Sequence, residues 1–324
     1  MAYEQKIEVN LGHRPGLKSM RQLDPAAAAQ ARVENTGFSL EAARRRRTSR
    51  PQDLAGRNGF NTEHLDDFNV QLPSPLGVLA DDVLTVEGRS DGRLDYTNFT
   101  VIMRASRRMA LFTAVNIEGQ QSVSVERSND KWSLDGRIPA EFQLGEDLYS
   151  GNRLDRGHLV RREDPNWGPD AEVANGDTFH FTNCAPQMDM FNQREWLGLE
   201  NYILQNARAW KDRCSVFTGP IFGASDLPYR GALIPRSFWK VVAFLTDDGK
   251  PSTTAYILTQ DKELEGLEAA YGAYKTYQRS VASIQKMTNL DFHGLAAFDG
   301  FSNEEAATGL EISAELVTLG AIRV

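Results

Sequence analysis

The chain contains only two cysteines, Cys184 and Cys214, in 324 residues. Two cysteines are too few for a disulfide framework, and their spacing does not form the Cys-x-x-Cys pattern of a metal site. Two buried thiols are favoured over one disulfide between them. Histidine is also scarce, and the five residues include no His-x-x-x-His pair, which excludes a zinc site built from several histidines.

Long apolar segments are absent as well. No stretch approaches the roughly 18 consecutive apolar residues of a membrane span, so no membrane partner is expected. The first residues, MAYEQKIEVNLGHRPG, lack the apolar run of a signal peptide. The expected localisation is therefore open between the cytoplasm and export by another route. The hydrophobic content of 41% is ample for a packed globular core.

The main part of the chain is short of positive charge. The formal net charge of −8 argues against a protein that coats nucleic acid through charge alone. Residues 1–58 sum to +5 and residues 59–324 to −13, so we predict a basic N-terminal extension with short helices, followed by one domain. That domain needs a locally positive cleft to bind a polyanion. The run Arg44–Arg47 could hold phosphate, dock on the acidic domain of a second copy, or form a solvated helix face.

Apolar runs predict several strands in the middle of the chain. Phe99–Met103 and Ala110–Ile117 are typical of buried strands. Similar runs cover residues 215–218, 239–245 and 253–258, and helical patterns cover residues 192–210 and 261–287. Strands and helices do not alternate in the regular βαβ order of a doubly wound sheet, so the pattern favours an α+β fold.

The most informative segment is Asp155-Arg156-Gly157-His158. A neutral imidazole near pH 7 can accept a proton from water, and an adjacent guanidinium can hold two phosphate oxygens. The glycine between them lets backbone and substrate approach closely. These groups fit phosphodiester hydrolysis. The alternative is a histidine hydrogen-bonded to an aspartate for structural reasons, which is the commoner arrangement when such a pair stands alone.

A second pair of polar residues lies on the predicted helix over residues 192–210. Asn192 and Glu200 are eight positions apart, so they drift only about 80° around a helix with 3.6 residues per turn. Both side chains can therefore face one cleft. Their oxygens suit Mg²⁺, which takes one or two protein oxygens and keeps several waters. The alternative is that both are ordinary surface residues of the helix.

Several motifs in register resemble those of the DNA/RNA non-specific endonucleases of the ββα-metal type, the endonuclease G-like family. The motifs are DRGH, TNCAPQ at Thr182–Gln187, Asn192-Gln193, Trp196 and Leu199-Glu200. With flanking stretches the resemblance spans about residues 94–292, roughly two thirds of the chain. It implies an α+β ββα-metal nuclease domain over residues 59–324, with a mixed or antiparallel central sheet flanked by helices.

The resemblance also implies a role for each matching residue. His158 would be the general base, Asn192 the one direct protein ligand of Mg²⁺, and Glu200 the holder of a metal-bound water. Arg156 would help to order the phosphate. Arg127 is the best match, in ERSNDKWSLD, to an arginine that stabilises the transition state, and Lys131 is the alternative.

Two further residues and one departure complete the comparison with the family pattern. Asp155 and Asn183 are expected to support the site structurally. Family members often carry an arginine one helical turn after the glutamate, where this chain has Leu204. Arg208, a further turn along, could reach the same phosphate, or the grip on substrate is weaker.

The implied activity is sequence-non-specific cleavage of DNA and RNA that depends on Mg²⁺ and leaves 5′-phosphate ends. Mn²⁺ or another divalent cation is expected to be able to substitute. The family pattern is compatible with a homodimer. Since a free nuclease would endanger its own cytoplasm, we expect an inhibitor or regulatory partner that acts through residues 1–58. Two rivals stay open: a binding or scaffolding protein without turnover, and a hydrolase of small phosphodiesters.

Overall fold

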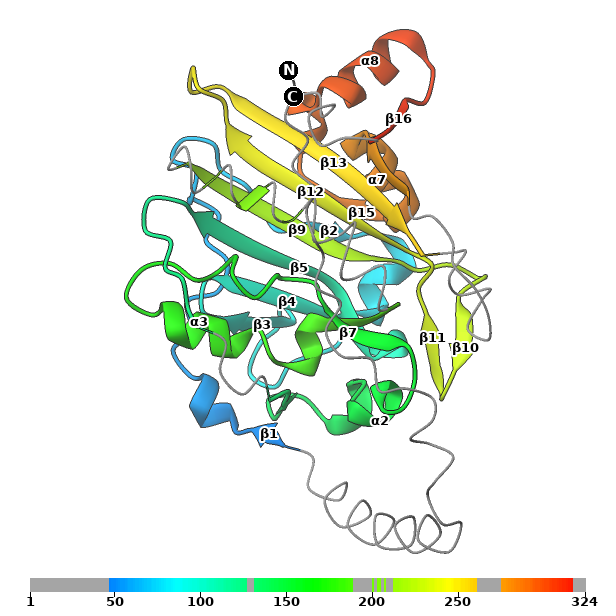
Figure 1. The fold of residues 1–324 in the computed structure, drawn as a ribbon. Coiled ribbons are helices and arrows are strands. Elements are labelled where there is room, and N and C mark those ends of the chain that lie inside the picture. The colour runs from blue at the N-terminus through cyan, green and yellow to red at the C-terminus, as the bar shows by residue number, and fades with distance from the viewer. Residues whose placement is uncertain are drawn as a thin grey trace, which may run out of the picture. The chain divides into compact units, whose positions relative to one another are not determined.

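A computed structural model gives the fold of the chain (Figure 1). It describes residues 47–126, 131–188, 200, 203–204, 207, 212–260 and 275–316. Within these residues, no helix is long and apolar enough to cross a membrane.

Residues 47–316 are built around one eight-stranded antiparallel sheet. In Figure 1 its strands can be followed from β3 and β4 through β5, β9 and β12 to β13. Its strands, from one edge to the other, are β16 (Ser313–Glu315), β14 (Lys275–Arg279), β13 (Pro251–Thr259), β12 (Ser237–Leu245), β9 (Arg213–Ile221), β5 (Met109–Glu118), β4 (Phe99–Arg104) and β3 (Arg93–Tyr96). Helices lie outside this sheet instead of alternating with its strands. The predicted α+β class is confirmed, and the sheet is of the antiparallel kind.

The strands form where both faces of the sheet can be buried. All ten residues of β5 are buried, which requires the continuous apolar run seen in the sequence. The five predicted strands are confirmed and lie in β4, β5, β9, β12 and β13.

One predicted element is wrong in part. The helical pattern predicted over residues 261–287 contains strand β14, and helix α7 occupies only Val281–Thr288. Thr276 and Gln278 are buried, whereas Tyr277 and Arg279 are only partly buried, and this alternation is typical of a strand. Helix α7 starts after this strand because the Ser280 hydroxyl caps it by accepting a hydrogen bond from the amide of Ser283.

The two faces of the sheet carry two separate hydrophobic clusters. Val101 and Met103 of β4 point into the first cluster, together with residues of the β7–β8 hairpin. Ile102, between them, points into the second cluster, together with α7. Strands β7 (Leu154–His158) and β8 (Cys184–Met188) therefore lie on one face of the sheet and α7 on the other.

Short elements complete the described part of the chain. The remaining strands are β1 (Thr48–Ser49), β2 (Ser74–Pro75), β6 (Leu134–Asp135), β10 (Leu227–Tyr229), β11 (Ala232–Ile234) and β15 (Leu290–Asp291). The remaining α-helices are α2 (Glu146–Tyr149), α3 (Ala171–Asp177) and α8 (Gly300–Thr308). The 3-10 helices are η2 (Pro51–Leu54), η3 (Gly77–Asp82), η4 (Ala105–Arg107), η5 (Ala140–Phe142), η6 (Phe181–Asn183) and η8 (Leu295–Phe298).

The compact body begins at Arg47, earlier than the predicted boundary after residue 58. Strand β1 pairs in parallel with β6, and Leu54 is buried in the first cluster. Arg57 donates a hydrogen bond of 2.8 Å to Asp177. Residues 47–58 thus belong to the body. The helices predicted before residue 47 lie outside the described residues.

Both cysteines are buried thiols, and no disulfide joins them. The Tyr149 hydroxyl lies 3.1 Å from Cys184 Sγ. Burial raises the pKa of Cys184 to about 12 and the pKa of Cys214 well above its usual value. At neutral pH both sulfurs are therefore protonated and inert as nucleophiles.

Candidate active site

The DRGH segment forms the first strand of a two-stranded hairpin. Residues 154–158 of β7 pair antiparallel with β8, so that His158 lies opposite Cys184 and Arg156 opposite Pro186. Because side chains alternate along a strand, Arg156 and His158 project to the same side. The structure therefore brings the predicted base and the predicted phosphate ligand to one surface.

Gly157 is required by close packing within this hairpin. A Cβ atom at this position would collide with the side chain of Gln187, which lies over it from β8. Gln187 is fully buried, and its amide nitrogen and oxygen have no hydrogen-bond partner among the described residues. The glycine of DRGH thus leaves the space that the buried Gln187 side chain occupies.

Asn183 closes the loop that follows His158. Its main-chain oxygen accepts from the amide of Leu159 at 2.9 Å, and its side-chain oxygen accepts from the amide of Val160 at 2.8 Å. Its side-chain nitrogen donates to the carbonyls of Val160 and Thr178. Since Asn183 is fully buried, these bonds cannot be exchanged for water. Asp155, the other predicted support, is half-buried on β7.

His158 is half-buried against aromatic rings. Its ring centre lies 4.7 Å from that of Trp132 and 5.1 Å from that of Phe179. Trp132 in turn packs on Phe181 at 5.7 Å, and Phe181 packs on Tyr149 at 6.2 Å. These contacts restrict the rotation of the imidazole and exclude water from one of its sides.

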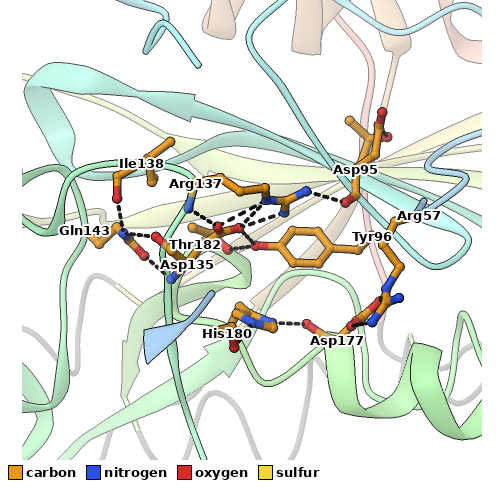
Figure 2. A network of polar contacts seen from close by, with 12 residues as sticks. Arg57, Asp95, Tyr96, Asp135, Arg137, Ile138, Gln143, Asp177, His180 and Thr182 are labelled. Atoms are coloured by element: carbon orange, nitrogen blue, oxygen red, sulfur yellow. Dashed lines mark hydrogen bonds and ion pairs between the residues drawn. The ribbon is translucent and has the colours of Figure 1, made fainter. Parts of the chain in front are cut away.

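A buried polar network, shown in Figure 2, fixes the segment that carries Trp132. The Tyr96 hydroxyl bonds to Asp135 and lies 2.6 Å from the Thr182 hydroxyl. Arg137 donates to Asp135 at 2.7 Å, and Gln143 exchanges two hydrogen bonds with the main chain of Asp135. The network joins the Trp132 segment to strand β3 and to η6, the turn before β8.

The charge of Asp135 stabilises this network. Burial alone would raise the pKa of Asp135, but the hydrogen bonds and charge of Arg137 outweigh burial and hold the pKa below its usual value. Burial raises the pKa of Tyr96 well above its usual value, so its hydroxyl keeps its proton. In the sequence, Asp135 is only the last residue of the motif ERSNDKWSLD and has no predicted role of its own. Its buried role depends on a hydrogen bond from Tyr96, 39 positions away, which no local pattern contains.

Glu200 is a buried acidic residue near the segment that follows β7. Arg161, three residues after His158, lies 3.5 Å from the main-chain oxygen of Glu200. Lys240 Nζ lies 3.5 Å from Glu200 Oε1, too long for a normal hydrogen bond, and donates to the Thr218 hydroxyl at 2.8 Å. Burial raises the pKa of Glu200 to about 7, against the opposing charge of Lys240.

The remaining predicted ligands lie outside the described residues. Asn192, the predicted metal ligand, and Arg127, the predicted transition-state arginine, both fall there. Within the part of the chain that is described, no three His, Cys, Asp or Glu side chains are grouped to hold a metal ion. Of the predicted site, the structure thus places Asp155, Arg156, His158, Asn183 and Glu200.

Arg156 has an acidic partner that sequence reasoning missed. Its Nε donates to Glu146 Oε2 at 3.0 Å, and its Nη2 contacts Glu146 Oε1. The guanidinium also lies over the ring of Tyr149, 5.6 Å from its centre. Glu146 is the first residue of α2, and nothing in the sequence distinguishes it from other surface acids.

The chain belongs to the DNA/RNA non-specific endonuclease family, because the family's model matches residues 82–297. The resemblance stated from the motifs is thereby confirmed. The match includes the β7–β8 hairpin and seven of the eight strands of the central sheet in full, so the family's region contains the site described above.

The chain is also similar to curated proteins. The chain is 39% identical to "Uncharacterized protein y4fB" of Sinorhizobium fredii over 305 residues, which is 86% of this chain and 46% of that protein. It is 28% identical to mitochondrial endonuclease G of Bos taurus and 30% identical to that of Homo sapiens. These matches cover 41% and 34% of this chain, and 47% and 40% of the respective relatives. The chain thus spans about half the length of the curated relatives it matches.

A solved structure shares the fold. A chain in the crystal structure of the EndoG/EndoGI complex superposes with a TM-score of 0.52 at 16% identity. The superposition covers 64% of this chain and 87% of that chain. The predicted nuclease fold is confirmed by this likeness.

Proposed function

We propose that this protein is a metal-dependent endonuclease that hydrolyses phosphodiester bonds in DNA and RNA without reading base sequence. Family membership supports the reaction class. The observation that carries the proposal for this chain is the β7–β8 hairpin, which presents Arg156 and His158 on one side, with His158 packed against two aromatic rings. A decayed relative that only binds would not need this arrangement to be intact.

His158 is the proposed general base. As a neutral imidazole near pH 7 it takes the proton from the water that attacks phosphorus. Trp132 and Phe179 hold its ring in one orientation, so that little rotational freedom is lost when substrate binds. Arg156 and Arg127 neutralise the non-bridging oxygens as charge develops on them. Since these contacts reach phosphate and not base edges, sequence goes unread, and cleavage is proposed to leave 5′-phosphate ends.

Asn192 and Glu200 are the residues proposed to hold the metal, Asn192 directly and Glu200 through a water. Glu200 fits this role because its buried Oε1 accepts no hydrogen bond from any described residue, which leaves a carboxylate oxygen for a cation-bound water. When bound, Mg²⁺, or Mn²⁺ in its place, would lower the cost of the extra negative charge on the phosphate.

Metal removal tests the proposal. We expect plasmid DNA and single-stranded RNA to be cut in Mg²⁺ and to stay intact in excess chelator. The Asn192→Ala variant should need a higher Mg²⁺ concentration for half-maximal rate, because it removes the direct ligand. Cleavage that persists in chelator, or an unchanged metal titration in the variant, would contradict the assignment. Hydrolysis of a dinucleotide with no action on polymers would favour the small-phosphodiester rival.

An inhibitor is the proposed partner, acting through the N-terminal residues. The structural neighbour comes from the EndoG/EndoGI complex, in which EndoG is inhibited, and this supports an inhibitor as the kind of partner. The structure changes the design of the test, because residues 47–58 pack on the body and must be kept. Deletion of residues 1–46 should alter activity, oligomer size or partner binding. A deletion variant unchanged in all three would refute the regulatory role.

A further inference from the structure

The ion pair between Arg156 and Glu146 places a carboxylate where a phosphate is proposed to bind. Two guanidinium nitrogens, Nε and Nη2, face the two carboxylate oxygens. A guanidinium binds two oxygens of a carboxylate and two non-bridging oxygens of a phosphate with the same planar fork. Glu146 therefore satisfies the donors that a substrate phosphate would use.

The carboxylate can leave this position without moving the backbone. Arg230 anchors helix α2 by donating to the carbonyl of Ser150 at 2.6 Å and to that of Asp147 at 3.2 Å. The Glu146 side chain itself is 52% exposed, and Arg156 is 31% exposed. Rotation of the Glu146 side chain into solvent is thus enough to free the guanidinium. Tyr149 stays beneath Arg156 and keeps it facing the same way.

We propose that Glu146 is a built-in competitor of the substrate: it occupies the phosphate-binding fork of Arg156, and nucleic acid binds there by displacing it. This inference rests on the proposed function, since it uses Arg156 as a phosphate ligand. Glu146 would then lower the affinity for nucleic acid, because the free energy of the Arg156–Glu146 ion pair is lost each time substrate binds.

The size of that cost follows from the exposure of the pair. Exposed ion pairs stabilise by about 0.2–1 kcal/mol, which corresponds to a change of roughly 1.4- to 5-fold in an equilibrium constant. Removing the competitor should tighten binding by a factor in this range. The opposite role, in which Glu146 holds Arg156 ready for substrate, predicts weaker binding on its removal. The sign of the change therefore separates the two roles.

The test measures binding without cleavage. A fluorescently labelled DNA duplex is titrated in excess chelator with wild type, Glu146→Gln and Glu141→Gln, and affinity is read from anisotropy. Glu141 is the matched control, since it is exposed, lies in the same segment, and makes no hydrogen bond or ion pair with the described residues. Both variants remove one negative charge, so any general electrostatic gain appears in both.

We expect Glu146→Gln to bind about two- to fivefold more tightly than Glu141→Gln, and this difference to vanish when Arg156→Ala is added to each. Equal affinity of the two variants, or weaker binding by Glu146→Gln, would overturn the inference. A wild type that cuts DNA in Mg²⁺ while Glu146→Gln gains no affinity removes this inference alone. If neither wild type nor variants bind DNA and no cleavage occurs, the proposed function falls with it.

Discussion

Replacement of His158 by alanine should slow the cleavage of plasmid DNA by about 10²- to 10⁴-fold, the usual contribution of a general base. The loss arises because, among the described residues of β7, the other polar side chain on the same side is Arg156, which is permanently charged and cannot accept a proton near pH 7. Initial rates at saturating Mg²⁺ measure the effect.

Two variants separate chemistry from packing at this position. His158→Asn keeps a planar polar group against Trp132 and Phe179, so it should fold as wild type and remain as slow as His158→Ala. His293→Ala is the matched control, because His293 follows Phe292, which packs in the cluster on the other face of the sheet. The control should cut at the wild-type rate. Near wild-type cleavage by either His158 variant would remove the assignment of the base.

Gly119→Ala is expected to lower the free energy of unfolding by about 1–3 kcal/mol, the range for overpacking in a tight interior. Gly119 follows the last residue of β5, and its amide donates to the carbonyl of Asp212 at 2.9 Å. A Cβ atom here would collide with the main-chain oxygen of Ala207, a backbone atom that cannot turn aside. Ala207 packs in the first hydrophobic cluster, so its main chain must shift away from the end of β5.

Chemical denaturation of Gly119→Ala beside Gly176→Ala measures this effect. Gly176 lies within α3 and is exposed. A Cβ atom added there would have no described atom within 4 Å. The control should keep or gain stability, because alanine is favoured over glycine in a helix by roughly 0.5–1 kcal/mol. A Gly119→Ala variant as stable as Gly176→Ala would mean that the close approach is not required.

The parts of the fold that could be predicted are those set by local pattern. Apolar runs such as Ala110–Ile117 are typical of buried strands, and the structure contains these strands. Residues 275–279 lie within the helical pattern predicted over residues 261–287, but they form strand β14. Pairing with β13 decides their conformation, and this depends on a partner about twenty residues earlier.

The site divides in the same way. Arg156, Gly157 and His158 could be predicted because a guanidinium, a glycine and an imidazole follow one another in a single strand. Glu146 could not, because it meets Arg156 only after α2 folds beside β7. Asn183 could be placed as a support because it is part of a recognisable motif, although its bonds to Val160 and Thr178 required the structure.

The burial of both faces of the eight-stranded sheet has a consequence for divergence. The side chains of Val101 and Ile102 pack in the two apolar clusters, so these positions constrain volume and shape and tolerate exchange among aliphatic residues. A lineage can therefore replace most of its interior while the backbone keeps its course. This explains how a neighbour with 16% identity still superposes on this chain, and why the polar residues of the hairpin identify the family better than the sheet that holds them.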